Sequence, residues 1–139
     1  MRIIVVGCGT AGSRFAVTLA RDGHEVTVVD RNPDAFARLG SEFPGATLTG
    51  VAIDEDVLRE AGAEQADALA ALTGSDSTNL VVGQLAVRRF KIPRVLVRVR
   101  EPEKEEAFRA AGLNIFCPTR LLVQEWARYL GTGGNQPCT

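Results

Sequence analysis

The feature that most constrains this chain is a glycine-rich hexapeptide near its start, Gly7-Cys8-Gly9-Thr10-Ala11-Gly12. It follows an apolar, β-branched run at residues 2–6 and precedes an amphipathic stretch. In a G-x-G-x-x-G motif the first glycine permits a tight turn, the second lets a phosphate approach the backbone, and the third allows close helix–strand packing. Free N–H groups and the positive end of the helix dipole then face the anion. The motif predicts a βα unit that holds an adenine nucleotide or dinucleotide.

Short β-branched runs alternate with longer amphipathic stretches in the rest of the chain, which predicts βα units around a parallel sheet. We expect strands at 2–6, 25–29, 46–49, 68–73, 94–99 and 114–117, and helices at 10–21, 33–43, 55–60, 75–90, 103–111 and 119–130. In the first helix, Phe15 and Leu19 are expected to face inward. The prediction is a Rossmann-like α/β domain with a doubly wound parallel sheet of six strands, at residues 1–130. We expect the Gly- and Pro-rich tail at 131–139 to be disordered.

Composition narrows the possible partners. The formal net charge is −1, so the charge balance does not favour nucleic acid or a lipid surface. Six basic residues lie within 88–100, but without the aromatic pattern that base stacking needs. Three widely spaced cysteines fit a reducing cytosol. The apolar run at the N-terminus is too short for a membrane span, so no direct membrane insertion is expected.

An acidic residue, Asp30, ends the second expected strand, at the distance from the glycines where a carboxylate accepts hydrogen bonds from ribose hydroxyls. Asp30 would also repel a 2′-phosphate, which disfavours NADP, although the adjacent Arg31 weakens that discrimination. A glycine turn with an incidental acid is the alternative. The strand, glycines, helix and acid occur in the order that nucleotide binding requires, and this favours a site.

Further candidates lie at the carboxyl ends of later strands, where ligands bind in open α/β sheets. Thr73 and Gly74 follow the fourth strand, and Asn79 lies one turn into the next helix. Arg98, on the fifth strand, is placed to offer a phosphate its fork of donors. A solvated or ion-paired strand residue is an equally good interpretation of Arg98.

Catalytic and metal-binding patterns are not found in the sequence. The single histidine, His24, lies in a turn before the second strand, and no Cys, His and carboxylate cluster has metal-ligand spacing. An apolar stripe on the last expected helix indicates either an interface or ordinary packing onto the sheet. Its members are Leu121, Leu122, Trp126, Tyr129 and Leu130.

These motifs resemble the N-terminal nucleotide-binding half of the regulators of K⁺ conductance, the RCK or KTN domains of TrkA-N type, found in regulatory subunits of Trk and Ktr potassium uptake systems. The resemblance spans about residues 1–127, and its most specific segment is LREAGAEQADALAALTGSDSTNL. It implies a nucleotide-sensing subunit, not an enzyme. NAD(H), ATP, ADP or AMP would bind over Gly7, Gly9, Gly12 and Asp30, with Thr73, Gly74, Asn79 and Arg98 completing the pocket.

The resemblance also implies an assembly. The helix from Thr119 would correspond to a crossover helix through which two domains pair. The homodimer would be the unit of a larger ring beneath an integral membrane K⁺ channel or transporter subunit, at the inner face of the membrane. The family usually has an acidic residue after the glycine that ends the third strand, where this chain has Val51 and then Ala52. That difference bears on nucleotide preference, because the position lies near the adenine.

Two other functions stay open at this stage. The chain would be the cofactor domain of an NAD-dependent oxidoreductase if a substrate domain and a catalytic His, Lys or Tyr existed. The chain would be a partner-binding module with a role other than potassium transport if it bound a different membrane protein.

Overall fold

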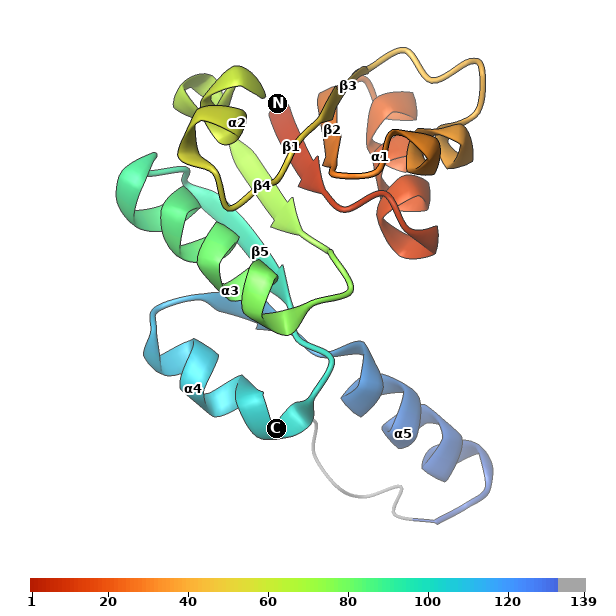
Figure 1. Ribbon diagram of the computed structural model, residues 1–139. Coiled ribbons are helices and arrows are strands. Elements are labelled where there is room, and N and C mark those ends of the chain that lie inside the picture. Colours follow the sequence, from red (N-terminus) through yellow and green to blue (C-terminus); the bar gives the residue numbers. More distant parts are fainter. Residues whose placement is uncertain (133–139) are drawn as a thin grey trace.

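The computed structural model describes residues 1–132, so most of the expected tail at 131–139 lies outside the described residues. All strand pairs are parallel, and the sheet has six strands in the order β3-β2-β1-β4-β5-β6 (Figure 1). The strands are β1 (Arg2–Val6), β2 (Glu25–Asp30), β3 (Ala46–Thr49), β4 (Ala68–Ala71), β5 (Arg94–Arg98) and β6 (Asn114–Phe116). The predicted Rossmann-like fold class is confirmed.

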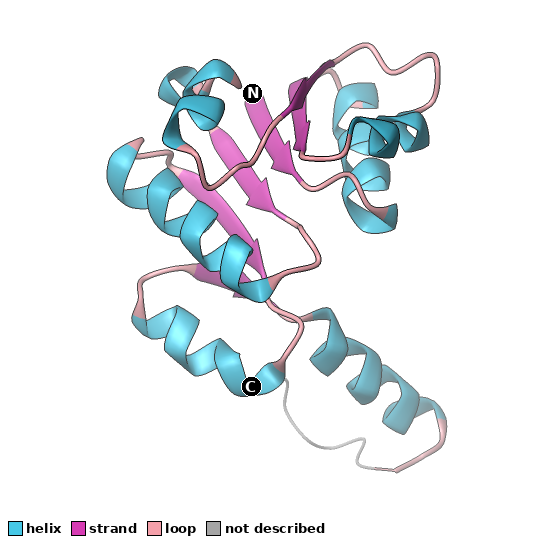
Figure 2. Ribbon diagram, in the orientation of Figure 1, coloured by secondary structure: helices cyan, strands magenta, loops and turns pink. Residues whose placement is uncertain are grey.

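Helices connect these strands on both faces of the sheet (Figure 2). The α-helices are α1 (Thr10–Arg21), α2 (Glu55–Glu60), α3 (Asp76–Gln84), α4 (Glu105–Ala110) and α5 (Pro118–Tyr129). Short 3-10 helices are η1 (Pro33–Leu39), η2 (Ala63–Gln65) and η4 (Pro102–Lys104), and η3 (Leu85–Arg89) is a π-helical turn. Helix starts follow the local capping signals: Asn32, Asp54 and Ser75 each accept an N–H bond from the first turn that follows.

Side chains along each strand alternate between the two faces of the sheet, and this divides the interior into two cores. Ile4 and Val6 of β1 pack with α2, α3 and α4, whereas Ile3 and Val5 pack with α1 and η1. Successive side chains of a strand point to opposite faces, so a continuous apolar run is what a strand covered on both faces requires. The sequence of β1 therefore specifies a central strand.

One part of the sheet is open on the α1 side. A groove of about 550 Å³ runs past β4 and β5, and its walls include Phe15, Leu19, Ala70, Val87 and Leu96. Phe15 is 37% exposed, so the expectation that it faces inward was wrong, while Leu19 packs against the core on that side. Helix α1 covers β1 and β2 but does not extend over β5, and Phe15 lies on its uncovered flank.

Two expected helices are shorter in the structure. The helix after β2 ends at Leu39, because Gly40 has a φ of +83° and turns the chain away. The long helix expected at 75–90 is α-helical only to Gln84 and continues as the turn η3. Lys91, with a φ of +54°, then reverses the chain so that Ile92 packs into the core.

The last helix, α5, projects away from the sheet (Figure 1). None of its residues is buried. A salt bridge from Arg120 Nε to Glu105 Oε1, 2.7 Å long, ties its first turn to α4. No helix within residues 1–132 is long and apolar enough to cross a membrane.

Candidate functional site

A crevice of about 490 Å³ lies at the carboxyl ends of β1, β2 and β4. The sheet order reverses between β1 and β4, and ligands of open α/β sheets bind at such a switch point. We call this hollow the switch-point crevice. The residues lining it are Val6, Gly7, Cys8, Gly9, Val29, Asp30, Arg31, Gly50, Val51, Ala52, Ile53, Leu72, Thr73, Gly74, Ser75 and Thr78.

The glycine loop forms the floor of the crevice, and its glycines have different roles. Gly7 has a φ of +104°, and a Cβ there would lie 2.8 Å from the Leu72 carbonyl carbon. A Cβ on Gly12 would lie 2.0 Å from the Gly7 carbonyl oxygen. Gly9 has nothing within 4 Å of its Cβ position, so protein packing alone does not require a glycine there. Gly7 and Gly12 hold the turn together, and Gly9 leaves open space beside the start of α1.

Asp30 organises this loop from the end of β2. Its Oδ2 accepts the Cys8 N–H at 2.8 Å, and its Oδ1 accepts the Asn32 N–H at 2.8 Å. Both carboxylate oxygens are therefore fixed in place, each with acceptor capacity to spare for a ligand hydroxyl. The start of α1 lacks a side-chain cap and an acidic residue, so its first N–H groups suit an anion.

The Cys8 side chain points away from this chemistry. It is fully buried, and its thiol donates to the Ala35 carbonyl oxygen at 3.3 Å. Burial, together with the nearby Asp30 carboxylate, raises the pKa of the Cys8 thiol despite the opposing effect of Arg38. A thiol with a raised pKa forms little thiolate at neutral pH. Cys8 therefore contributes its backbone to the crevice and its side chain to the core.

The wall nearest β3 is apolar. Val51 and Ile53 are each about half exposed beside the crevice, and Gly50 is tied to the end of β2 by an N–H bond to the Asp30 carbonyl at 3.0 Å. An exposed pair of branched side chains next to a carboxylate suits the flat apolar face of a base. Ile53 is part of this wall and was not predicted from the sequence.

The opposite wall is built around Asn79, which is fully buried at the start of α3. Its Oδ1 accepts from the Thr73 N–H at 2.9 Å and the Thr73 hydroxyl at 2.6 Å. Its Nδ2 donates to the carbonyl oxygens of Thr73 and Arg98, at 3.0 and 2.9 Å. Asn79 is thus a clamp between β4 and β5, and it does not line the crevice.

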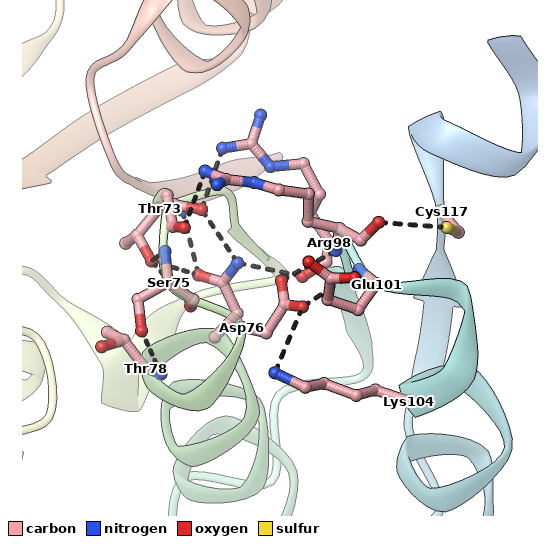
Figure 3. A network of polar contacts seen from close by, with 11 residues as sticks. Thr73, Ser75, Asp76, Thr78, Arg98, Glu101, Lys104 and Cys117 are labelled. Carbon is pink, nitrogen blue, oxygen red and sulfur yellow. Dashed lines mark hydrogen bonds and ion pairs between the residues drawn. The ribbon is translucent and has the colours of Figure 1, made fainter.

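Arg98 also bonds to the protein backbone. Its Nη2 donates to the Leu72 and Thr73 carbonyl oxygens, at 2.5 and 2.9 Å (Figure 3). Burial, and secondarily the charge of Arg100, lowers the pKa of this guanidinium, although Asp76 opposes the shift. The Arg98 side chain is half-buried and bonds to two backbone carbonyls. It closes the end of β4.

Of the fourteen predicted site residues, the structure brings together in the crevice Gly7, Cys8, Gly9, Asp30, Arg31, Val51, Ala52, Thr73 and Gly74. The other five are not part of the lining: Thr10 and Ala11 are exposed at the start of α1, and the remaining three are Gly12, Asn79 and Arg98. Ser75 and Thr78 line the crevice and were missed. The sequence signal that could have identified them is the helix N-cap at Ser75. Ser75 Oγ accepts the Thr78 N–H at 3.2 Å, which places both residues at the crevice end of α3. Within residues 1–132 no cluster of His, Cys, Asp and Glu could hold a metal ion.

The parallel sheet, the glycine loop before α1 and the carboxylate ending β2 define a Rossmann-like domain with a ligand crevice at its switch point. Within that class, the chain belongs to the TrkA-N domain family, which matches residues 3–118. The predicted family is confirmed.

Curated relatives are potassium uptake proteins. The Trk system potassium uptake protein TrkA of Streptomyces coelicolor is 37% identical over 137 residues, covering 99% of this chain and 61% of that protein. A TrkA homolog of Archaeoglobus fulgidus is 37% identical over 142 residues, covering 96% of this chain and 31% of the homolog. The chain thus spans less than two thirds of the length of these relatives.

Solved structures agree with the fold. The TrkA-N domain of the inner membrane protein ybaL from Escherichia coli superposes with a TM-score of 0.82 at 16% identity, covering 93% of this chain and 96% of that one. The GsuK channel is 26% identical and gives a TM-score of 0.74, both bound to NAD and bound to ADP. Each comparison covers 94% of this chain, and 23% and 33% of the respective GsuK chains.

Proposed function

We propose that this chain is a nucleotide-sensing regulatory domain of a potassium uptake system, which binds NAD(H) or ATP, ADP or AMP and does not catalyse a reaction. The observation that carries the proposal is the Asp30 carboxylate, held by the Cys8 and Asn32 N–H groups at the edge of the glycine loop. This arrangement places a hydroxyl acceptor beside an anion site, which is the pairing that a ribose phosphate requires.

The ligand would lie across the crevice with its parts matched to three walls. Ribose hydroxyls donate to Asp30, a phosphate lies over Gly9 at the start of α1, and the adenine packs on Val51 and Ile53. A 2′-phosphate on the ribose would meet the Asp30 carboxylate, so NADP is disfavoured by charge repulsion, which the adjacent Arg31 weakens. The lining residues include no His, Lys or Tyr side chain, which argues against an oxidoreductase, since hydride transfer usually needs an acid or base near the nicotinamide.

Signalling requires a partner, and residues 1–132 present an exposed apolar helix face for it. The apolar stripe of α5 is exposed, with Trp126 at 61% and Tyr129 at 88%. We propose that α5 pairs two copies of the chain, with the open groove beside Phe15 and Val87 as the receiving surface. The nucleotide would have a different affinity for each of two dimer arrangements, so its binding would favour one of them. The favoured arrangement would in turn change the activity of a membrane channel or transporter. The site of action is the cytoplasmic side of the membrane.

Nucleotide binding is tested by thermal unfolding of the purified chain with AMP, ADP, ATP, NAD, NADH and NADP. A ligand at a hundred times its Kd stabilises the fold by about 2.7 kcal/mol, which shifts the midpoint by several degrees. Gly9→Asp, which adds a negative charge where the phosphate would lie, should abolish the shift. Ser41→Asp adds the same charge at an exposed residue outside the crevice lining and should leave the shift intact. No shift with any nucleotide would contradict the proposal.

The potassium role is tested separately by K⁺ uptake in cells that lack the subunit. Wild-type protein should change the uptake rate and Gly9→Asp should not. Equal uptake with and without wild-type protein would separate the domain from potassium transport while leaving nucleotide binding intact.

Pairing through α5 is tested by sedimentation of the wild type, Trp126→Ala and Arg128→Ala. Trp126 belongs to the apolar stripe, and Arg128 pairs with Glu125 on the same helix. We expect a dimer for the wild type and Arg128→Ala, and a monomer for Trp126→Ala. A monomeric wild type would contradict pairing.

A further inference from the structure

The switch-point crevice is lined asymmetrically. A dinucleotide in a doubly wound sheet uses both sides of the switch point, one mononucleotide half on each. Here the lining comes from β1, from β2, from the loops that follow β1, β2, β3 and β4, and from the first turn of α3, and no residue of β5 or β6 contributes. The hollow therefore covers the half where Asp30 lies and stops at the end of β4.

Two arginines of the chain occupy the other side. Arg98 Nη2 donates to the Leu72 and Thr73 carbonyl oxygens, and Arg100 Nη2 donates to the Gly74 carbonyl oxygen at 2.9 Å. These three carbonyls follow β4 in sequence, at the edge that a second mononucleotide half would cross. Figure 3 shows the Arg98 side chain reaching back over the end of β4 toward Thr73.

The two arginines donate hydrogen bonds to backbone carbonyl oxygens that follow β4. The pairing of β4 with β5 ends at Ala71 and Val97, whereas β5 continues to pair with β6 through the Val99 N–H bond to the Phe116 carbonyl at 3.0 Å. The carbonyls after β4 then lack strand partners and take guanidinium donors. Asp76 holds the segment that follows β5 by accepting the Arg100 N–H at 2.8 Å, so these side chains start from a fixed backbone.

We propose that the crevice selects an adenine mononucleotide over a dinucleotide, with Arg98 and Arg100 as the residues that determine this specificity. The inference rests on the proposed nucleotide binding and names the ligand class. A nicotinamide ribose would have to displace both guanidinium groups, and the carbonyls of Leu72 and Gly74 would lose these donors. AMP or ADP, in contrast, would keep its phosphate over Gly9 inside the crevice, and both guanidinium groups would stay bonded in place. The GsuK channel has been solved with NAD and with ADP, so similarity to it does not decide between the two classes.

The test is isothermal titration of the full chain with AMP, ADP and NAD, and with nicotinamide mononucleotide as a competitor against ADP. Losing one charge-assisted hydrogen bond weakens binding by about tenfold or more. We therefore expect NAD to bind at least about tenfold more weakly than ADP, and nicotinamide mononucleotide not to compete. NAD binding as tightly as ADP or AMP would overturn the inference. If none of the adenine ligands binds, the proposed function itself fails, which is a different result.

Single substitutions test whether Arg98 and Arg100 cause the discrimination between ADP and NAD. Arg98→Ala should reduce the ratio of NAD to ADP dissociation constants by at least about threefold, because removing one guanidinium frees part of the second half. Arg94→Ala, at the opposite end of β5 and outside the crevice, is the matched control and should keep the wild-type ratio. If Arg98→Ala does not fold, Arg100→Ala decides, since its guanidinium is more exposed. An unchanged ratio of NAD to ADP dissociation constants in Arg98→Ala, or in Arg100→Ala if Arg98→Ala does not fold, would overturn the role of the arginines.

Discussion

Replacing Asp30 by alanine tests the link between the fold and the site, because the same carboxylate holds the loop and faces the crevice. The two N–H groups that it accepts differ in surroundings. Cys8 is fully buried, whereas the bond to Asn32 is exposed to water. Asp30→Ala therefore leaves one buried donor without an acceptor and returns the other to solvent.

The expected loss follows from that difference. A buried N–H left unpaired costs about 1–3 kcal/mol, and an N–H that regains water costs little. For a domain of this size a loss of about 2 kcal/mol lowers the unfolding midpoint by about 5–10 °C. Asp30→Asn keeps one oxygen but turns an amide donor toward one of the two N–H groups. Its unfolding midpoint should therefore lie between those of Asp30→Ala and the wild type.

The assay is thermal unfolding followed by circular dichroism, with and without ADP. Both Asp30 variants should unfold earlier than the wild type and should lose most of the ADP-induced shift. Asp22→Ala, an exposed acid at the end of α1, is the control and should match the wild type in both respects. An Asp30→Ala midpoint equal to that of Asp22→Ala would refute the reasoning that the carboxylate holds the glycine loop.

Three further predictions rest on other contacts. Gly12→Ala should destabilise the fold by at least about 3 kcal/mol, because its Cβ would lie 2.0 Å from a carbonyl oxygen. Gly9→Ala should leave the free energy of unfolding, measured by urea denaturation, within about 0.5 kcal/mol of the wild type. Asn79→Ala should cost about 3–5 kcal/mol in the same denaturation assay, since four hydrogen bonds of a fully buried amide are lost. A raised thiol pKa means that unfolded Cys8 ionises first, so stability is full below its ordinary pKa of about 8.5 and falls as pH rises toward the folded value. Cys8→Ala should flatten the decline in stability between about pH 8 and 10, and an equally steep decline would contradict the assignment.

Much of the fold could be predicted from local sequence signals. The glycine loop, the apolar runs of the strands and the capping residues Asn32, Asp54 and Ser75 act over a few residues, because backbone conformation and N–H satisfaction are decided nearby. The position of Asp30 at the end of a strand followed from the same pattern. These signals determined the parallel sheet and the half of the crevice that contains the acid.

Other features were decided only by the tertiary structure. Sequence spacing put Asn79 and Arg98 at the correct edge of the sheet, but both side chains turn to carbonyls where the pairing of β4 with β5 ends. Phe15 has the periodicity of a core residue, yet it faces a part of the sheet that no helix of the described chain covers. Periodicity records which face of an element is apolar, whereas the partner of that face depends on where distant strands and helices end. The sequence alone therefore determined the glycine motif and its acid, and the three-dimensional arrangement decided which side chains line the crevice.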